Sequence, residues 1–219
     1  MEPQNSDILN MPLLPLRGLV LFPRMILHFD VGRPRSIRAV EHALRNNTPV
    51  FITTQKDIRD ADPTSDALYS VGTIATVRQT VRLGPAMRVL VEGIDRAKLT
   101  RVWQEEPYSR VEVERKKIAP VHASDAKGEA LLRRARELFE EYITRSPNAP
   151  QELILNAMGE DELGYLADYM TQNCAASTTD RQRILETFDP LKRIERVTEL
   201  LAREIDVLEI NQEMAGKVQ

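Results

Sequence analysis

The sequence lacks two features that are typical of secreted, redox or membrane-bound proteins, because it has few cysteines and no long apolar run. It contains one cysteine, Cys174, in 219 residues, which excludes an internal disulfide framework and favours a reducing compartment. The longest strictly apolar run near its N-terminus, residues 19–22, is far too short to span a bilayer. Residues 1–7 are polar and acidic, and they lack the basic and apolar regions of a signal peptide. We therefore expect a cytoplasmic protein with no membrane partner.

Motifs of common catalytic and nucleotide-binding sites are also missing. There is no GxxxxGK phosphate loop, no GxGxxG, and no HExxH, CxxC or GxSxG motif. The three histidines, His28, His42 and His122, do not have the spacing of a metal site. Cys174 has no histidine nearby in the sequence, so a packed small side chain is favoured over a nucleophile. We expect no catalytic residue, no bound cofactor and no metal in this region.

Neither sign of charge is in large excess. The formal net charge of −3 gives no general attraction to nucleic acid or to anionic membranes, so we expect no nucleic-acid partner. The strongest basic cluster, Arg33, Arg35 and Arg38, has no interleaved aromatic residues, which favours a surface patch over a phosphate site. The acidic run 160–162 opens a predicted helix, where the helix dipole favours negative charge; we prefer this explanation to an acid/base role.

The first half of the chain has the pattern of short strands around one helix. A helix is predicted from an N-cap at Ser36 to Asn47, because Ile37, Val40 and Leu44 share one face. Turn signals at Gly84-Pro85 and at Gly93 predict breaks between strands. The spacing predicts a small barrel over residues 1–119. Its predicted strand segments are 11–17, 26–31, 50–54, 71–77, 87–91, 99–103 and 108–114.

The second half, residues 120–219, has helical periodicity. Ser124 is the predicted cap of a helix whose apolar stripe includes Leu131, Ala135, Leu138 and Tyr142. Further helices are predicted over 151–158, over 161–172 and after a cap at Thr178 or Thr179. Short connections between them favour a compact bundle. The fold class is therefore α+β, a β-barrel with one helix followed by an α-helical bundle that ends in a long helix.

The last predicted helix is longer than a small domain can cover. Asp189 is its N-cap, Pro190 is its first residue, and helical periodicity continues to Leu208. At 1.5 Å per residue the helix is on the order of 45 Å long, so we expect it to lead into a further part of a larger protein. Residues 194–205 are expected to pack on their own bundle. The residues expected to contact another subunit or to form a linker are Leu208, Ile210, Met214 and Val218.

Several segments in order resemble one known family. Residues 12–23, with the sequence PLLPLRGLVLFP, are similar to the opening of the N-terminal domain of Lon, the ATP-dependent protease family. Residues 31–36, VGRPRS, are similar to the strand-to-helix junction of the family. The resemblance covers nearly the whole chain, and its specificity comes from the order and spacing of the segments. Further similar segments are 55–57, 68–73, 89–93, 166–168 and 200–209.

The resemblance implies a PUA-like β-barrel followed by a helical bundle. It implies a role in recognising misfolded, damaged and selected regulatory proteins in the bacterial cytoplasm, and in assembling a homohexamer. In the family, ATP and Mg²⁺ belong to an ATPase module that comes later in the chain, followed by a Ser-Lys protease module. No position of this sequence matches their catalytic motifs, so no catalytic residue is carried over and this region is not expected to be an enzyme by itself.

A receptor for unfolded protein needs an adaptable apolar surface, and two segments offer one. We hypothesise that turn-flanked residues near 18–25 and the apolar tip near 83–87 form a patch for unfolded segments. The alternative, that Leu19, Leu21 and Phe22 belong to the barrel core, stays open. So does the interpretation of the chain as a stand-alone PUA-like module that binds RNA or protein. The candidate substrate-binding residues are Leu19, Val20, Phe22, Met25, Pro85 and Met87.

Overall fold

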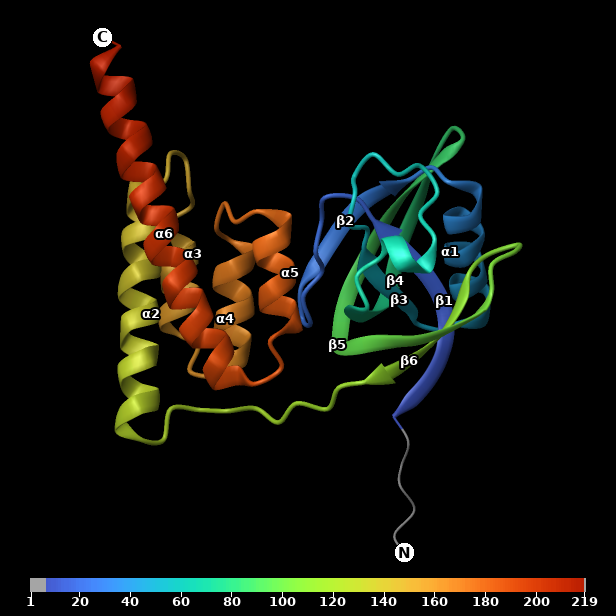
Figure 1. Ribbon diagram of the computed structural model, residues 1–219, viewed down its shortest axis with the longest axis horizontal. Coiled ribbons are helices and arrows are strands. Elements are labelled where there is room, and N and C mark those ends of the chain that lie inside the picture. Colours follow the sequence, from blue (N-terminus) through green and yellow to red (C-terminus); the bar gives the residue numbers. More distant parts are fainter. Residues whose placement is uncertain (1–6, 219) are drawn as a thin grey trace, which may run out of the picture. The chain divides into compact units, whose positions relative to one another are not determined.

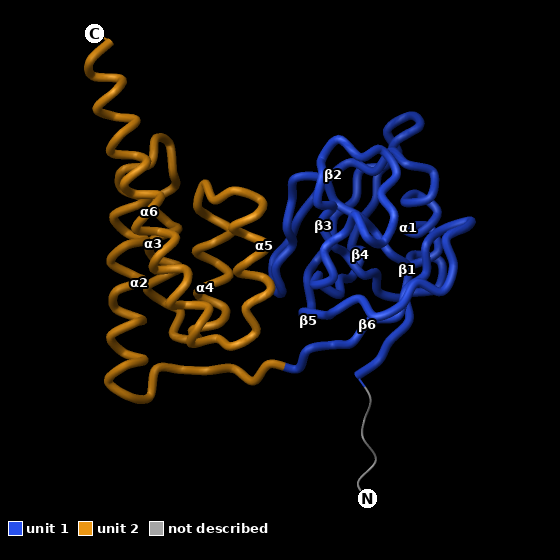
Figure 2. The backbone as a smooth tube through the Cα atoms, in the orientation of Figure 1, with its two compact units in different colours: residues 1–117 blue, residues 118–219 orange. Residues whose placement is uncertain are grey.

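The chain forms two compact units, residues 1–117 and 118–219, which Figure 2 shows in separate colours. The structure is a computed structural model that describes residues 7–218. The division lies close to the boundary predicted after residue 119. Each unit has its own core, and the two are described separately below.

Unit 1 is a mixed sheet that closes into a barrel (Figure 1). The strand order is β2-β5-β4-β3-β1-β6, and a further pairing of β5 with β6 closes the sheet. The β1–β3 pair is parallel, and the other pairs are antiparallel. The elements are β1 (Ile8–Leu16), β2 (Ile26–Val31), α1 (Pro34–Asn46), β3 (Val50–Thr54), the 3-10 turn η1 (Ser65–Ala67), β4 (Val71–Leu83), β5 (Ala86–Gln104) and β6 (Arg110–Arg115).

Strand β5 explains how so few strands close a barrel. It is 19 residues long; its first part pairs with β2 and its last part with β6. The prediction of two strands separated by a turn at Gly93 is therefore wrong. The pairing register of β4 with β5 shifts where Ile74 pairs with Asp95 and Ala75 pairs with Gly93. Strand β5 therefore has one extra residue here, and it bulges and bends without ending.

Helix α1 lies on the barrel with Ile37, Ala39, Val40 and Ala43 buried. Its N-cap is Arg33, not the predicted Ser36, which is itself buried inside the helix. The reason is Pro34: its fixed φ and missing N–H suit the first helical position, so the helix begins there.

Unit 2 is a bundle of five helices in the described residues. Asp125 caps α2 by accepting a hydrogen bond from the Gly128 N–H (2.7 Å), so the predicted cap at Ser124 is one residue early. Ser177 caps α5, in place of Thr178 or Thr179. The predicted cap at Asp189 is confirmed, with its side chain accepting from the Leu191 N–H. The helices are α2 (Ala126–Arg145), α3 (Glu152–Met158), α4 (Leu163–Gln172), α5 (Thr178–Glu186) and α6 (Pro190–Lys217).

Helix α6 packs against α2 and α4. Ile194, Val197 and Leu201 are fully buried, as predicted for a stripe that packs on its own bundle. Near the end of α2, Gln212 donates to the carbonyl oxygen of Arg145, the last residue of that helix (3.3 Å). Figure 1 shows the rest of α6 continuing beyond the other helices of the bundle.

A buried ion pair joins α4 to α6. The Arg193 and Asp168 side chains are 3% exposed, and Arg193 Nη1 lies 3.5 Å from Asp168 Oδ2. The same guanidinium donates to the carbonyl oxygens of Thr187 (2.8 Å), Gly164 (3.2 Å) and Phe188 (3.1 Å). Arg193 therefore ties two backbone segments, the start of α4 and residues 187–188, to the start of α6.

Cys174 is buried, and burial raises the pKa of its thiol to about 11. Little thiolate is then present in the folded protein at mildly alkaline pH, and thiolate is the reactive form. We expect a colorimetric thiol reagent to modify the native chain slowly and the denatured chain at the rate of a free cysteine. Fast modification of the folded chain would contradict this account of a packed side chain.

Candidate functional site

The loop between β1 and β2, residues 17–25, closes one end of the barrel. The hydroxyl groups of Thr54 and Thr73 donate to the carbonyl oxygens of Leu19 (2.6 Å) and Leu21 (2.7 Å). At Gly93 an added Cβ would lie 2.3 Å from the Phe22 carbonyl oxygen. A glycine is therefore required where the loop crosses β5.

This anchoring turns most of the candidate side chains of the loop inward. Val20 is 3% exposed, Phe22 is fully buried and Met25 is 9% exposed. The expectation that these three side chains form an exposed patch is wrong, because the loop seals the barrel and its apolar residues complete the core. Leu21 is buried with them, whereas Leu19 is only half-buried.

The β4–β5 hairpin divides its apolar residues between two faces. Gly84 adopts φ +61° at the turn, where Leu83 pairs with Ala86. Pro85 is exposed at the tip, as the hypothesis requires. Met87 is only 5% exposed, because it stands opposite Val31 of β2 on the inner face of the sheet. The prediction of an exposed Met87 is therefore wrong.

Leu19 lies instead on a groove of about 340 Å³ between β1 and β2. The end of β1 and the following loop form one wall. Phe29 and Val31 of β2 form the other, and the start of α1 completes the groove. The apolar lining residues are Pro15, Leu16, Leu19, Phe29 and Val31, and the others are Arg17, Asp30, Gly32, Arg33 and Ser36. The sequence hypothesis included only Leu19 of this set.

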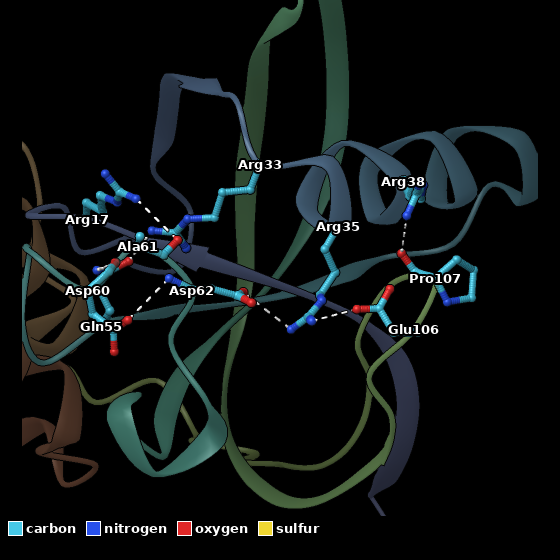
Figure 3. A network of polar contacts seen from close by, with 10 residues as sticks. All are labelled: Arg17, Arg33, Arg35, Arg38, Gln55, Asp60, Ala61, Asp62, Glu106 and Pro107. Atoms are coloured by element: carbon cyan, nitrogen blue, oxygen red, sulfur yellow. Dashed lines mark hydrogen bonds and ion pairs between the residues drawn. The ribbon is translucent and has the colours of Figure 1, made fainter.

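Two arginines at the groove are bound to neutral oxygen atoms (Figure 3). Arg33 Nη2 donates to Gln55 Oε1 (2.6 Å), and Arg17 Nη2 donates to the Ala61 carbonyl oxygen (3.5 Å). The Gln55 side chain is buried, and its Nε2 donates in turn to the carbonyl oxygens of Asp57 (2.7 Å) and Asp60 (2.9 Å). These bonds hold the polar loop after β3 against the edge of the groove.

The other two arginines of the basic cluster are engaged outside the groove. Arg35 contacts Glu106 (2.7 Å) and Asp62 (3.4 Å), and Arg38 donates to the Pro107 carbonyl oxygen (3.4 Å). The hydrogen bond from Arg35 to Glu106 raises the pKa of Arg35 above its usual value. These contacts favour a surface network that joins α1 to the β5–β6 connection, in agreement with the preference for a surface patch.

The end of α6 carries exposed apolar side chains. Ile210 is 55% exposed, Met214 is 61% and Val218 is 89%, while Leu208 is half-buried. Val207, which the sequence hypothesis omitted, is 43% exposed. Positions 207, 210, 214 and 218 step by three or four, so they form one stripe on the helix.

The described residues, 7–218, bring together no group of three or more His, Cys, Asp or Glu side chains that could hold a metal ion. No helix in that range is long and apolar enough to cross a membrane.

Residues 10–203 match the family described as the ATP-dependent protease La (LON) substrate-binding domain. The chain belongs to this family. It is 39% identical over its full length to a Lon protease of Heliobacterium modesticaldum, and 37% identical over 98% of its length to one of Desulforamulus reducens. It is also 35% identical over 96% of its length to Lon protease 1 of Bacillus subtilis. The chain spans about a quarter of the length of these relatives, between 26% and 27%.

Solved structures of Lon N-terminal domains have the same fold. The N-terminal domain of a Mycobacterium avium complex Lon protease superposes with a TM-score of 0.68 at 20% identity, covering 88% of this chain and 98% of that one. A Lon N-terminal domain protein from Xanthomonas campestris gives a TM-score of 0.59 at 16% identity, covering 89% of this chain and 98% of that one. Both support the α+β architecture of a barrel followed by a helical bundle.

Proposed function

We propose that this chain recognises substrate for an ATP-dependent serine protease of the Lon type. Its substrates are misfolded, damaged and selected regulatory proteins of the bacterial cytoplasm, and it binds their exposed apolar segments at the β1–β2 groove. The observation that carries this proposal is the groove, which is lined by five apolar residues and two arginines. It lies in a chain that belongs to a family of substrate-binding domains.

The physical basis is the burial of apolar surface that folded proteins hide and unfolded ones expose. At about 340 Å³ the groove lies at the lower end of the range for ligand pockets, so it holds a few residues of a long chain. Each site therefore binds weakly, and several copies in one assembly raise the overall affinity by multivalency.

Leu19 offers a direct test, because its side chain is half-buried at the groove while its carbonyl oxygen is held by Thr54. We expect Leu19→Ser to weaken binding of a reduced, carboxymethylated unfolded protein several-fold, measured by fluorescence anisotropy. The matched control is Ile8→Ser, which removes a 48%-exposed apolar side chain of unit 1 that does not line the groove. Equal affinities of the two variants would count against the groove.

We also propose that the exposed stripe of α6 contacts other subunits in a homohexamer. Helix pairing requires apolar residues at steps of three and four. The contacts of Glu209 (2.9 Å) and Gln212 (3.3 Å) with Arg145 mark where α6 reaches the end of α2.

For this chain alone we expect weak, concentration-dependent self-association in sedimentation experiments, and Ile210→Asp should reduce it. The matched control is Glu213→Asp, which keeps the charge of an exposed α6 residue outside the stripe. A stable hexamer of this chain alone would contradict our expectation that assembly mostly needs the ATPase module of the family.

The rival function, an RNA-binding module, lacks a supporting observation. Arg35 is paired with carboxylates, and Arg17, Arg33 and Arg38 donate to amide or carbonyl oxygens within the domain. The groove beside Arg17 and Arg33 has five apolar lining residues and one carboxylate, Asp30, which suits an unfolded polypeptide better than the phosphate chain of a nucleic acid.

A further inference from the structure

Strand β2 is an edge strand whose open side borders the groove. Among the described residues β2 pairs with β5 alone, and the groove separates it from β1. Just before β2, the N–H of Gly93 donates to the carbonyl oxygen of Met25 (2.9 Å). Antiparallel pairing alternates, so odd-numbered residues of β2 direct their backbone groups to β5 and even-numbered ones direct theirs to the open side. The open backbone groups are the N–H and C=O of Ile26, His28 and Asp30.

The side chains around this edge suit an extended chain. Phe29 is half-buried and Val31 is buried on the inner face of β2, while Leu16 and Leu19 lie across the groove. Side chains of a strand alternate between faces, so every second residue of a strand added to β2 would point into this apolar space. Edge strands with unpaired backbone groups are where extended peptides add to sheets.

The charges around the groove favour an anionic group in the occupant. Asp30 is the one carboxylate that lines it, and Arg88 holds that carboxylate through two hydrogen bonds (2.8 and 3.3 Å). Burial and the nearby charge of Arg17 lower the pKa of Arg33, while Asp60 and Asp62 act in the opposite direction. A carboxylate brought beside Arg17 and Arg33 would relieve the repulsion between these two cations.

We propose that β2 accepts an extended segment of unfolded substrate as an added strand. Backbone hydrogen bonds would form to Ile26, His28 and Asp30, alternate apolar side chains of the segment would enter the groove, and an acidic side chain would lie beside Arg17 and Arg33. This inference rests on the proposed function and adds the mode of binding and the preferred segment. Main-chain hydrogen bonds suit a receptor of many substrates, because every extended polypeptide offers the same groups.

Amide hydrogen exchange tests this mode in the whole chain. The probe is a synthetic peptide as long as β2, with alternating valine and threonine and one glutamate near its end. We expect the peptide to slow exchange at the N–H groups of Ile26, His28 and Asp30, which face the open side, more than at Leu27 and Phe29, which already pair with β5. Replacing the glutamate by lysine should weaken binding several-fold.

A proline at position 28 removes one open N–H without removing a bond to β5. Proline is tolerated on the open side of an edge strand, so His28→Pro should fold, and it should bind the peptide about tenfold more weakly. His28→Thr is the control: it changes the same exposed side chain but keeps the N–H, so it should bind the peptide more tightly than His28→Pro does.

The outcomes separate the two proposals. If peptide and unfolded protein bind but the three open amides exchange as before, or His28→Pro binds like His28→Thr, strand addition is wrong and the proposed function stands. If neither probe binds at millimolar concentration, both proposals fail.

Discussion

Replacing Arg193 by methionine will lower the free energy of unfolding of unit 2 by about 3–5 kcal/mol. The substitution leaves the Asp168 carboxylate buried without its cation, and it removes donors from the carbonyl oxygens of Thr187, Gly164 and Phe188. Chemical denaturation followed by the helical circular dichroism signal measures the loss, because five of the six α-helices lie in this unit of the described chain.

The matched control for this prediction is Lys192→Met, which removes an exposed cation from the neighbouring position of α6. It should change the free energy of unfolding by no more than about 0.5 kcal/mol. The double variant Arg193→Met with Asp168→Leu should recover part of the loss, because no charge is then left unpaired. Equal stability of Arg193→Met and Lys192→Met would show that the buried pair contributes nothing.

Replacing Phe22 by alanine will destabilise unit 1 by about 3–5 kcal/mol. Phe22 is fully buried, and the loop that carries it is held by Thr73 and crosses β5 at Gly93. A cavity would remain at the end of the barrel, since this anchored backbone cannot collapse to fill it. The emission of Trp103, the only tryptophan of the chain and part of β5, reports the unfolding of this unit.

The control position for Phe22 is the nearby residue Ile26, whose side chain is 64% exposed and so contributes little to the core. Ile26→Ala should cost no more than about 0.5 kcal/mol. If Phe22→Ala left the stability of unit 1 unchanged and weakened only substrate binding, the assignment of Phe22 to the barrel core would be contradicted.

Local pattern was enough to predict most elements of the fold. The strands at 26–31 and 50–54 and the capped start of the last helix match the structure, because each depends on residues adjacent in sequence. The start of α1 was missed although Pro34 gave a signal for it. The continuous strand β5 was missed because Gly93, which usually marks a turn, is needed here for the close approach of the loop backbone.

The candidate site was predicted less well, since it depends on contacts between distant segments. The inward orientation of Val20, Phe22 and Met25 follows from Thr54, Thr73 and Gly93, which lie on other strands. Met87 is buried through its register with β2, which the local sequence does not reveal. The groove forms only when the end of β1 lies beside β2 in the folded chain. For this reason no local sequence pattern marks Phe29 or Arg17 as lining residues of the candidate site.

The central claim, that unfolded polypeptide binds at the β1–β2 groove, is tested most directly by amide chemical shifts of the isotope-labelled chain during titration with a reduced, carboxymethylated protein. We predict that the shifts concentrate at residues 15–19 and 29–33, which line the groove. Shifts confined to α2–α6, or none at millimolar concentration, would contradict the claim.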